Sequence, residues 1–451
     1  MTGDLDRADV TDILTAYATG AATPHDAVDL VLNRIARWEP ALNAFSARSE
    51  TLRAEAQAST DRWASGAAMG PLDGVPVVIK DNLVSRGLPA AWGNPTLAGR
   101  VAVHDELPVA RLRAAGALVI GKGNTPEFAV DGYTANATFG VTRNPFDPAL
   151  TPGGSSGGVV AAVASGMAFA GLATDGGGSI RRPAGYTGLV GLKSGIGHVP
   201  RGDGLPQLLL DFEVAGPVAR SLRDLRLLDA VLSGRSHASA PAGVARILAV
   251  PTLADAPCDP AILKAFATAS ASLSAQGHDV TTGQLPYDLA ALNAIWGQVA
   301  EVGLSGYFRQ HPEVAESAGP KYREMAARGD AVAPAAFQSV LMVINDLRTA
   351  ARDLWGFDAI LTPTSAAQPW PAEDSHPPVI AGMNVGPRGH AVYTGWVNAA
   401  GLPALAFPAP IAQGLPIGLQ LIGKTGAEGW LMDMVYPILS PFRWPNSRLA
   451  H

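Results

Sequence analysis

From about residue 70 onward, short apolar runs that are typical of strands alternate with segments that are typical of helices. Residues 75–79 predict a strand, residues 107–115 a helix and residues 117–120 a second strand. A helix is expected at residues 158–165 and a buried strand at residues 167–174. Such alternation is typical of a largely parallel sheet covered by helices on both faces. The chain is therefore predicted to fold as an α/β protein.

The amino-terminal part of the chain, residues 1–65, is predicted to be helical. Thr23 is expected to cap a helix that has Pro24 at its first position, and Pro40 is expected to end it. At roughly 100–200 residues per domain, 451 residues allow two or three domains. No linker divides the sequence, so one large α/β domain is equally compatible.

Composition and charge exclude several classes of protein. A hydrophobic content of 47% with 16% charged residues argues against a disordered chain. The net charge is −6 and the arginines form no basic stripe, which argues against nucleic acid as a direct ligand. The single cysteine, Cys258, excludes an internal disulfide and fits a reducing compartment. Because the first residues lack the basic-then-apolar order of a signal peptide, a cytoplasmic location is predicted.

Two long segments, residues 148–174 and 391–423, contain no charged residue. A membrane-spanning helix needs about 20 mainly apolar residues in succession. Pro152 and the glycine- and serine-rich residues 153–158 interrupt the first segment, and several prolines interrupt the second. Both are therefore predicted to be buried segments, and no membrane partner is expected.

Three short segments, far apart in the sequence, carry residues that make sense together as a catalyst. Residues 75–82 (VPVVIKDN) place Lys80 at the end of an apolar, strand-like run. Residues 151–158 (TPGGSSGG) and 174–183 (TDGGGSIRRP) place hydroxyls on glycine-rich backbone. There, N–H groups can surround a developing negative charge. The combination predicts a serine hydrolase whose base is a lysine.

Each segment alone has a simpler explanation. A strand-end lysine that reaches solvent accounts for Lys80 about as well, although the chain has only six lysines. A catalytic base must be neutral, and burial can lower the pKa of a lysine by up to about 3–5 pH units. The sequence around Ser155 formally matches the G-x-S-x-G elbow, but residues 144–152 contain three prolines where an elbow needs a strand. A flexible linker fits poorly, because the cluster is short and precedes an apolar helix.

The glycines before Ser179 could cradle a phosphate or an oxyanion. No lysine stands where a phosphate-binding loop needs one, so an oxyanion site with Ser179 as the attacking group fits better. Neither S-x-x-K nor H-E-x-x-H spacing is present. A β-lactamase-type serine and a zinc site are therefore not predicted.

Together the three segments closely resemble the amidase signature family, whose pattern is G-V-P-x-x-x-K-D-N, G-G-S-S-G-G and G-G-S-I-R-x-P-A. The resemblance extends to four further segments, residues 188–193, 214–220, 401–404 and 414–423. It implies one α/β domain over residues 1–451, with a central mixed sheet of about eleven strands covered by helices on both faces. Residues 70–235 would be the catalytic core. Residues 284–355 are helix-rich with few prolines, which predicts a helical insert near the substrate entrance.

The resemblance also assigns roles. Lys80 would be the base, Ser155 a bridging serine that follows a cis peptide bond, and Ser179 the acyl-forming nucleophile. Neutral Lys80 would accept a proton from Ser155 as Ser155 takes one from Ser179. No metal or organic cofactor is implied. The oxyanion hole would consist of the backbone N–H groups of Gly176, Gly177, Gly178 and Ser179.

Three positions after Asp175 carry separate expectations. Gly176 stands where the family usually has a larger residue, which predicts a more open or more mobile loop floor. Arg181 is expected to be a structural hydrogen-bond donor. Arg182 stands where malonamidase-like members hold a carboxylate-binding arginine, so it is a candidate substrate-binding residue for a small acidic amide. The alternative is that Arg182 points away into a salt bridge.

The predicted function is hydrolysis of a linear C–N amide bond in a small-molecule substrate through a Ser179 acyl-enzyme. Two alternatives stay open. One is the glutaminase (A) subunit of a tRNA-dependent amidotransferase, which makes ammonia for a partner; the acidic charge balance argues mildly against it. The other is a non-catalytic binding protein on the same fold; the presence of all three catalytic residues argues against it. Many family members dimerise, so a homodimer is compatible, although no stretch of the sequence identifies an interface.

Overall fold

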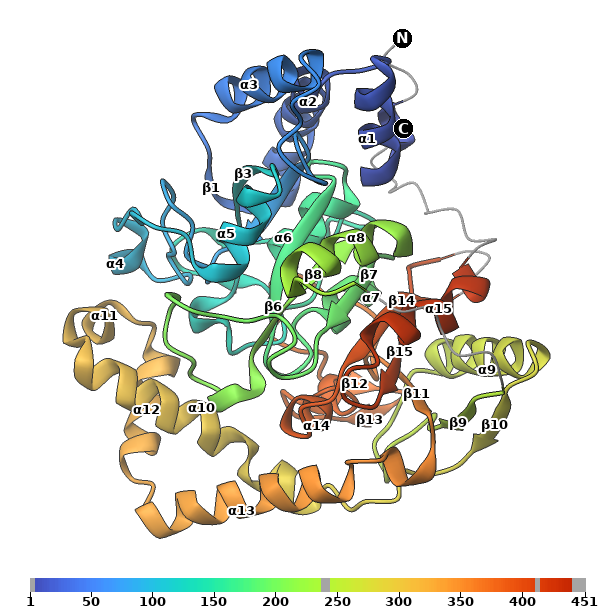
Figure 1. The fold of residues 1–451 in the computed structure, drawn as a ribbon. Helices are drawn as coiled ribbons and strands as arrows, with labels where there is room; N and C mark the ends of the chain where they lie inside the picture. The colour runs from blue at the N-terminus through green and yellow to red at the C-terminus, as the bar shows by residue number, and fades with distance from the viewer. Residues whose placement is uncertain (1–4, 237–243, 410–413, 440–451) are drawn as a thin grey trace.

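A mixed sheet of eleven strands runs through the molecule (Figure 1). The structure is a computed structural model that describes residues 5–236, 244–409 and 414–439. The ends of the predicted domain, residues 1–4 and 440–451, lie outside the described residues. In spatial order the strands are β1 (Phe45–Arg48), β3 (Leu118–Gly123), β2 (Pro76–Lys80), β6 (Ala170–Asp175), β8 (Val214–Ala219), β7 (Val190–Lys193), β14 (Ala404–Pro408), β15 (Gly418–Gly423), β11 (Ala359–Pro363), β9 (Arg246–Ala249) and β10 (Asp279–Thr282).

The sheet is mixed, as the family resemblance predicts, and the expectation of a largely parallel sheet is wrong. Only four neighbouring pairs are parallel: β2 with β3, β2 with β6, β9 with β10 and β9 with β11. Strand β8 lies between β6 and β7 and is antiparallel to both. The chain reaches β8 from β7 through the largely irregular residues 194–213, without the crossover helix that a parallel pair needs.

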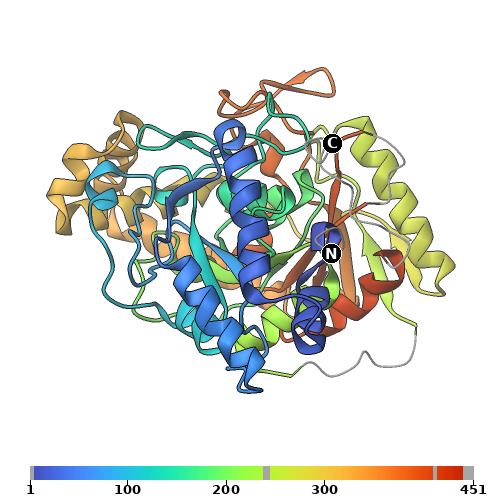
Figure 2. The same cartoon turned by 90° about the horizontal axis from the view of Figure 1, so that it is seen from above.

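Helices cover both faces of the sheet (Figure 2). Those that pack on it or next to it are α1 (Val10–Thr19), α2 (Pro24–Leu42), α3 (Leu52–Ala64), α5 (Leu107–Ala114), α6 (Gly157–Ala164), α7 (Arg181–Tyr186), α8 (Leu222–Ser233), α9 (Pro260–Ala275) and α15 (Glu428–Leu439). Two short helices are α4 (Pro95–Ala98) and α14 (Gly395–Ala399), and two small hairpins are β4 (Ala135–Asn136) with β5 (Gly140–Val141) and β12 (Val379–Ile380) with β13 (Met383–Asn384). Single 3-10 turns are η1 (Leu5–Arg7), η2 (Glu127–Ala129), η3 (Leu210–Phe212), η4 (Leu354–Gly356) and η5 (Gly389–Ala391).

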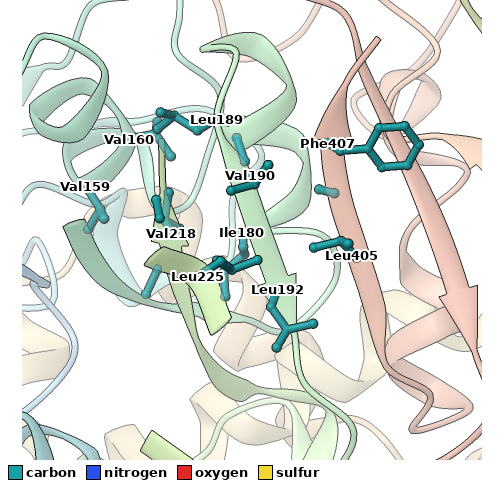
Figure 3. Close-up of a cluster of buried hydrophobic side chains, with 14 of the residues drawn as sticks. Val159, Val160, Ile180, Leu189, Val190, Leu192, Val218, Leu225, Leu405 and Phe407 are labelled. Atoms are coloured by element: carbon teal, nitrogen blue, oxygen red, sulfur yellow. The ribbon is translucent and has the colours of Figure 1, made fainter. Parts of the chain in front are cut away.

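Helix α6, which follows the GGSSGG segment, is buried along its whole length. Its sequence, GGVVAAVA, has no polar face, as expected for a helix enclosed by the core. A Cβ atom on Gly158 would lie 2.1 Å from the backbone nitrogen of Asn124, so only glycine lets the helix approach the end of β3 this closely. Figure 3 shows part of this core, with Val160 of α6 and Val218 of β8 among the labelled side chains.

The amino-terminal region contains α1, α2 and α3, and also β1, which pairs with β3 at the edge of the sheet. Thr23 caps α2 and accepts a hydrogen bond from the Asp26 N–H, as the sequence predicts. The prediction that Pro40 ends this helix is wrong, because α2 continues to Leu42. The missing proline N–H falls in the last turn, and the helix closes with the Asn43 N–H donated to Glu39.

The helix-rich region expected at residues 284–355 contains four helices, α10 (Ala290–Gln310), α11 (Pro312–Ser317), α12 (Pro320–Asp330) and α13 (Pro334–Ala350). In Figure 1 these yellow and orange helices lie at the opposite side of the sheet from α1–α3. Phe128 meets Tyr307 and Phe308 of α10 and Tyr322 of α12 edge to face. This aromatic cluster fixes α10 and α12 against the catalytic core.

No helix in the described part of the chain combines the length and the apolar composition that a membrane crossing requires.

Candidate active site

Lys80 is the last residue of β2, and its side chain is only 1% exposed. Its Nζ atom lies 2.7 Å from Ser155 Oγ, 2.8 Å from Thr174 Oγ1 and 3.2 Å from the Thr174 carbonyl oxygen. The lysine does not reach solvent at the strand end, which was its simpler explanation. Instead it joins its own sequence segment to the other two inside the protein.

Burial lowers the pKa of Lys80 to about 8. The carboxylates of Glu213, Asp175 and Asp81 oppose this shift, and the guanidinium of Arg201 adds to it. Desolvation disfavours the ammonium form and is the largest effect. About a tenth of the amine is therefore neutral at pH 7, far more than for a lysine in water, and this neutral form is the one that a base requires.

The three contacts of Nζ suit a neutral amine. A neutral amine has two N–H donors and one lone pair. The Thr174 carbonyl can only accept, so it takes one N–H, and Thr174 Oγ1 can take the other. The protonated amine donates to Ser155 Oγ, and in the neutral amine the lone pair can face Ser155 Oγ and accept its proton. The geometry gives Ser155 a proton acceptor at hydrogen-bonding distance.

The segment around Ser155 is held by its backbone. The peptide bond between Gly154 and Ser155 is cis, as the family resemblance implies. The Ser155 carbonyl accepts a hydrogen bond of 2.7 Å from Thr125 Oγ1. A Cβ atom on Gly154 would lie 2.3 Å from the Tyr133 carbonyl oxygen, so the close approach of these two chain segments needs a glycine.

The loop that leads to Ser179 is organised around the buried carboxylate of Asp175, at the end of β6. This carboxylate accepts the N–H groups of Gly178 and Ile180 and pairs with Arg181 through two hydrogen bonds of 2.9 and 3.0 Å. Burial alone would raise the pKa of Asp175, but Arg181 and the other donors hold it well below its usual value. Arg181 also donates to Gln420 and Asn398, so its expected role as a structural hydrogen-bond donor is confirmed.

Three of the four amides predicted for an oxyanion hole are free. The backbone N–H groups of Gly176, Gly177 and Ser179 donate to no residue in the described part of the chain, and all three residues line a pocket. Gly178 has another role, because its N–H is donated to Asp175 Oδ1 at 2.7 Å. Three amide donors of the loop are thus left without an internal partner beside the pocket, and the fourth, that of Gly178, anchors the loop on Asp175.

Ser179 borders the same pocket and is 6% exposed. Its hydroxyl makes no hydrogen bond to any residue that the structure describes, so the link to Ser155 is not formed here. The two serine loops nevertheless lie side by side. The guanidinium of Arg182 donates to the Gly177 carbonyl at 2.6 Å and to the Gly154 carbonyl at 3.4 Å, which ties one loop to the other.

Arg182 therefore does not point away into a salt bridge, which was the alternative for this residue. It is buried, it borders the pocket, and its third hydrogen bond goes to Thr394 Oγ1 at 2.8 Å. Its Nε atom has no hydrogen-bond partner among the described residues. Burial lowers the pKa of Arg182 to about 10, so it remains a cation at neutral pH.

The pocket beside Ser179 has a volume of about 140 Å³. A more open loop floor was expected at Gly176, but a Cβ atom there would lie 2.5 Å from Leu209 Cδ1, so Leu209 fills the space that a larger residue would take. A larger pocket of about 520 Å³ lies around Arg48 and Arg86 and contains none of the motif residues. The walls of the site pocket come from residues 129–132, the Ser179 loop, Leu209, Trp296 and Ala300 of α10, and residues 387–391, apart from Gly389.

Two residues of the lysine site, Thr174 and Asn82, received no role from the sequence. Thr174 holds Lys80 by both its hydroxyl and its carbonyl, and Asn82 Nδ2 donates to Thr174 Oγ1 at 3.2 Å. Both stand inside the quoted motifs: Thr174 directly precedes Asp175, and Asn82 follows Lys80 by two residues. Their position in the motifs was the only feature of the sequence that could have pointed to a role in the site. A polar residue at a strand end gives no indication of which side chain it meets.

Comparison with known proteins agrees with this geometry. The Amidase family profile matches residues 26–432. The A subunit of glutamyl-tRNA(Gln) amidotransferase from Symbiobacterium thermophilum is 32% identical over 93% of this chain and 94% of its own length. A crystal structure of an amidase superposes with a TM-score of 0.84 at 30% identity, over 95% of this chain and 98% of that one. The substrate complex of 6-aminohexanoate cyclic dimer hydrolase has a TM-score of 0.88 at 26% identity, over 98% and 99% of the two chains.

Proposed function

Because this chain belongs to the amidase signature family, we propose that it hydrolyses linear C–N amide bonds through an acyl-enzyme on Ser179. One observation carries the proposal. The buried Nζ atom of Lys80 lies 2.7 Å from Ser155 Oγ, in a loop tied to the one that presents Ser179 and its free amides to a pocket. A base, a relay hydroxyl and oxyanion donors beside a hydroxyl nucleophile are the parts that acyl transfer needs.

In the first half of the reaction, Ser155 passes its proton to the lone pair of Lys80 and takes the proton of Ser179. The freed electron pair of Ser179 Oγ attacks the amide carbon, and the carbonyl oxygen becomes an oxyanion. Rotation of the Ser179 side chain about χ1 on substrate binding would close its link to Ser155. Catalytic hydrogen bonds often tighten only in the substrate complex.

The oxyanion accepts the N–H groups of Gly176, Gly177 and Ser179. When the tetrahedral intermediate collapses, the C–N bond breaks, and the leaving amine takes a proton that returns from Lys80 through Ser155. Water then attacks the Ser179 ester with the same residues in the same roles. The acid leaves and Ser179 regains its proton, so Lys80 ends neutral. Removal of one oxyanion donor typically costs about 10²–10³-fold in rate.

The pocket favours a small acyl group. Its volume of about 140 Å³ is below the range of about 300–1,000 Å³ that is usual for drug-sized ligands. Arg182 stays our candidate for substrate contact, because its side chain borders this pocket and remains a cation. On this basis the proposed substrate is a small linear amide.

A second function is favoured by sequence similarity. The relative from Symbiobacterium thermophilum is named as the A subunit of a glutamyl-tRNA(Gln) amidotransferase. If this chain works as a glutaminase of that kind, it would release ammonia from glutamine for a partner protein. Ammonia release from glutamine that depends on a copurifying partner would establish this function. Turnover of other small amides by the isolated chain would support the first one.

Labelling with a fluorophosphonate probe tests whether Ser179 is the nucleophile, which both proposed functions require. Wild-type protein should be labelled on Ser179, and Ser179→Ala should lose the label together with at least about 10³-fold in amide turnover. Ser156→Ala is the matched control. It removes the hydroxyl next to Ser155, which donates a hydrogen bond to the Thr174 carbonyl, and it should keep the label. Full turnover by Ser179→Ala would exclude this residue as the nucleophile, and an unlabelled wild type would favour a non-catalytic binding protein.

A further inference from the structure

Three peptide groups of the glycine loop before the nucleophile are restrained by hydrogen bonds to their carbonyl oxygens. The carbonyl of Asp175 accepts the side-chain amide of Asn398 at 2.8 Å. The carbonyl of Gly177 accepts the Arg182 guanidinium at 2.6 Å, and the carbonyl of Gly178 accepts the Arg182 backbone N–H at 3.0 Å. Because a peptide group is planar, a bond to its carbonyl oxygen also restrains the direction of its N–H.

The peptide group between Gly176 and Gly177 is the exception in this loop. Neither its carbonyl oxygen nor its N–H takes part in a hydrogen bond with any residue in the described part of the chain. Glycine on both sides leaves the neighbouring torsions free, so the group can turn over without a clash of its own side chains. The N–H that it carries is that of Gly177, which borders the pocket. One donor of the proposed oxyanion site is therefore not fixed by hydrogen bonds.

Two apolar side chains from outside the loop pack against this peptide group. A Cβ atom on Gly177 would lie 3.0 Å from Cζ2 of Trp296, and one on Gly176 would lie 2.5 Å from Cδ1 of Leu209. Both side chains also border the pocket. The two α-carbons about which the group would turn are thus each covered by a side chain, and packing this close leaves little room for rotation.

Trp296 is itself held in place on α10. Its ring stacks on that of Phe212, with the ring centroids 5.7 Å apart and the planes 26° from parallel. The guanidinium carbon of Arg388 lies 4.6 Å from the centroid of the indole ring. A Cβ atom on Gly395 would lie 3.0 Å from Cη2 of the indole. A rigid ring with neighbours on several sides gives the loop a fixed surface to rest on.

We propose that Trp296 and Leu209 are positioning residues that keep the Gly177 N–H available to the oxyanion. This inference rests on the proposed function and concerns the step in which negative charge develops. The apolar contacts take the place of the hydrogen bonds that restrain the other peptide groups. Without them the group would turn over in part of the molecules, and its carbonyl oxygen would then repel the oxyanion. Since neither residue stands in a quoted motif, the oxyanion site is completed by parts of the chain outside the motifs.

The reaction of Ser179 with two sulfonyl fluorides tests this role without knowledge of the natural substrate. Ser179 Oγ forms a bond to sulfur, fluoride leaves, and the proton of Ser179 passes through Ser155 to Lys80. Negative charge develops on a sulfonyl oxygen, so the reaction uses the same amide donors. Methanesulfonyl fluoride is smaller than phenylmethanesulfonyl fluoride and reaches less of the pocket wall. Mass spectrometry of the intact protein gives the rate and the fraction of molecules that react. Misfolding lowers that fraction, whereas a misplaced donor lowers the rate.

Trp296→Ala should slow both reagents by the same factor, roughly 10–100-fold, at an unchanged reactive fraction. Trp296→Phe keeps a ring beside Gly177 and should lose only severalfold. Leu209→Ala should slow both reagents about tenfold. Trp38→Ala is the matched control, because Trp38 is also half-buried with an arginine over its ring, Arg37 at 4.4 Å, and does not border the pocket. It should keep the wild-type rate.

A wild-type rate in Trp296→Ala would overturn the inference. A loss confined to the larger reagent would overturn it as well, because the ring would then only be a wall for the acyl group. If Trp296→Ala does not fold, wild-type rates in both Trp296→Phe and Leu209→Ala would have the same meaning. Absence of Ser179 sulfonylation in the wild type would instead refute the proposed function. The two failures are therefore distinguishable in one assay.

Discussion

Two buried lysines at the ends of neighbouring strands show what distinguishes a base from a structural amine. Lys80 ends β2, and Lys122 lies near the end of β3, where it pairs in register with Ile79. Both side chains are almost completely buried, and burial lowers the pKa of each to about 8. By burial and basicity alone, the two amines are equivalent.

Their hydrogen-bond partners differ. Lys80 meets the hydroxyls of Ser155 and Thr174, and a hydroxyl can donate a proton to a lone pair. Lys122 donates to the carbonyl oxygens of Asp81 and Leu83, which can only accept. Carbonyl partners favour the ammonium form and fix the turn after β2. Burial therefore supplies a neutral amine, but only a neighbouring hydroxyl gives that amine a proton to accept.

The strongest test of this comparison replaces each lysine with methionine, which has a similar length and no charge. Lys80→Met should lower kcat/KM by about 10²–10⁴-fold, the usual contribution of a general base. Lys122→Met should leave kcat/KM of the folded protein within about tenfold of the wild type. It should lower stability by roughly 1–3 kcal/mol, because the carbonyls of Asp81 and Leu83 lose their donor in the interior. Amide turnover per labelled Ser179 and the midpoint of thermal unfolding measure the two effects.

The reverse pattern would break the comparison. If Lys122→Met lost activity at full stability while Lys80→Met stayed active, the base would be the wrong lysine. Equal losses of kcat/KM in both variants would mean that the hydroxyl partners of Lys80 do not distinguish the catalytic base from the other buried lysine.

The pH dependence of the wild type gives the next largest effect. With the pKa of Lys80 near 8, the neutral fraction falls about tenfold for each pH unit below that value. For a substrate that does not titrate, such as butyramide, kcat/KM should therefore decline by roughly 50-fold between pH 8 and pH 6. Initial rates in buffers of constant ionic strength measure this limb. A flat profile from pH 5 to pH 9 would contradict a neutral lysine as the base.

The sequence predicts most of what the backbone does. The motif strand at residues 75–79, the helix after Ser156 and the strand before Asp175 all appear within a few residues of their expected bounds. These elements are short apolar runs next to glycine or proline, so their periodicity and their ends are local properties. The direction of β8 was not predictable in this way, because it depends on the irregular return from β7.

The catalytic motifs were likewise visible, but their contacts were not. Lys80 and Ser155 are 75 residues apart, and they meet because β2 pairs with β6 while α6, which follows Ser155, packs against both strands. The anchoring of Gly178 on Asp175 depends on how a glycine loop turns, which its composition leaves open.

The smallest expected effect is a shift in the pH profile that identifies which buried lysine titrates. Protonation of any buried lysine could lower the activity at acid pH, so the profile of the wild type alone does not assign this loss to Lys80. Glu213 is the strongest of the charges that oppose the lowered pKa of Lys80, while burial remains the largest influence overall. It accepts hydrogen bonds from Asn82 at 3.3 Å and from Arg201 at 2.6 Å. Lys122 is influenced by Asp81, Glu106 and Asp105 instead.

Glu213→Gln removes a negative charge near Lys80 and leaves the Arg201 cation less compensated, so both changes should lower the pKa of Lys80 further. A lower pKa keeps the amine neutral to lower pH. The acid limb of kcat/KM should therefore move down by roughly 0.3–1 pH unit, and the rate at pH 6.5 should rise severalfold relative to the plateau. Asp211→Asn is the matched control, because it removes an exposed carboxylate two residues away that pairs with Arg348. A limb that stays in place in Glu213→Gln, or moves in both variants, would assign the titration to an amine other than Lys80.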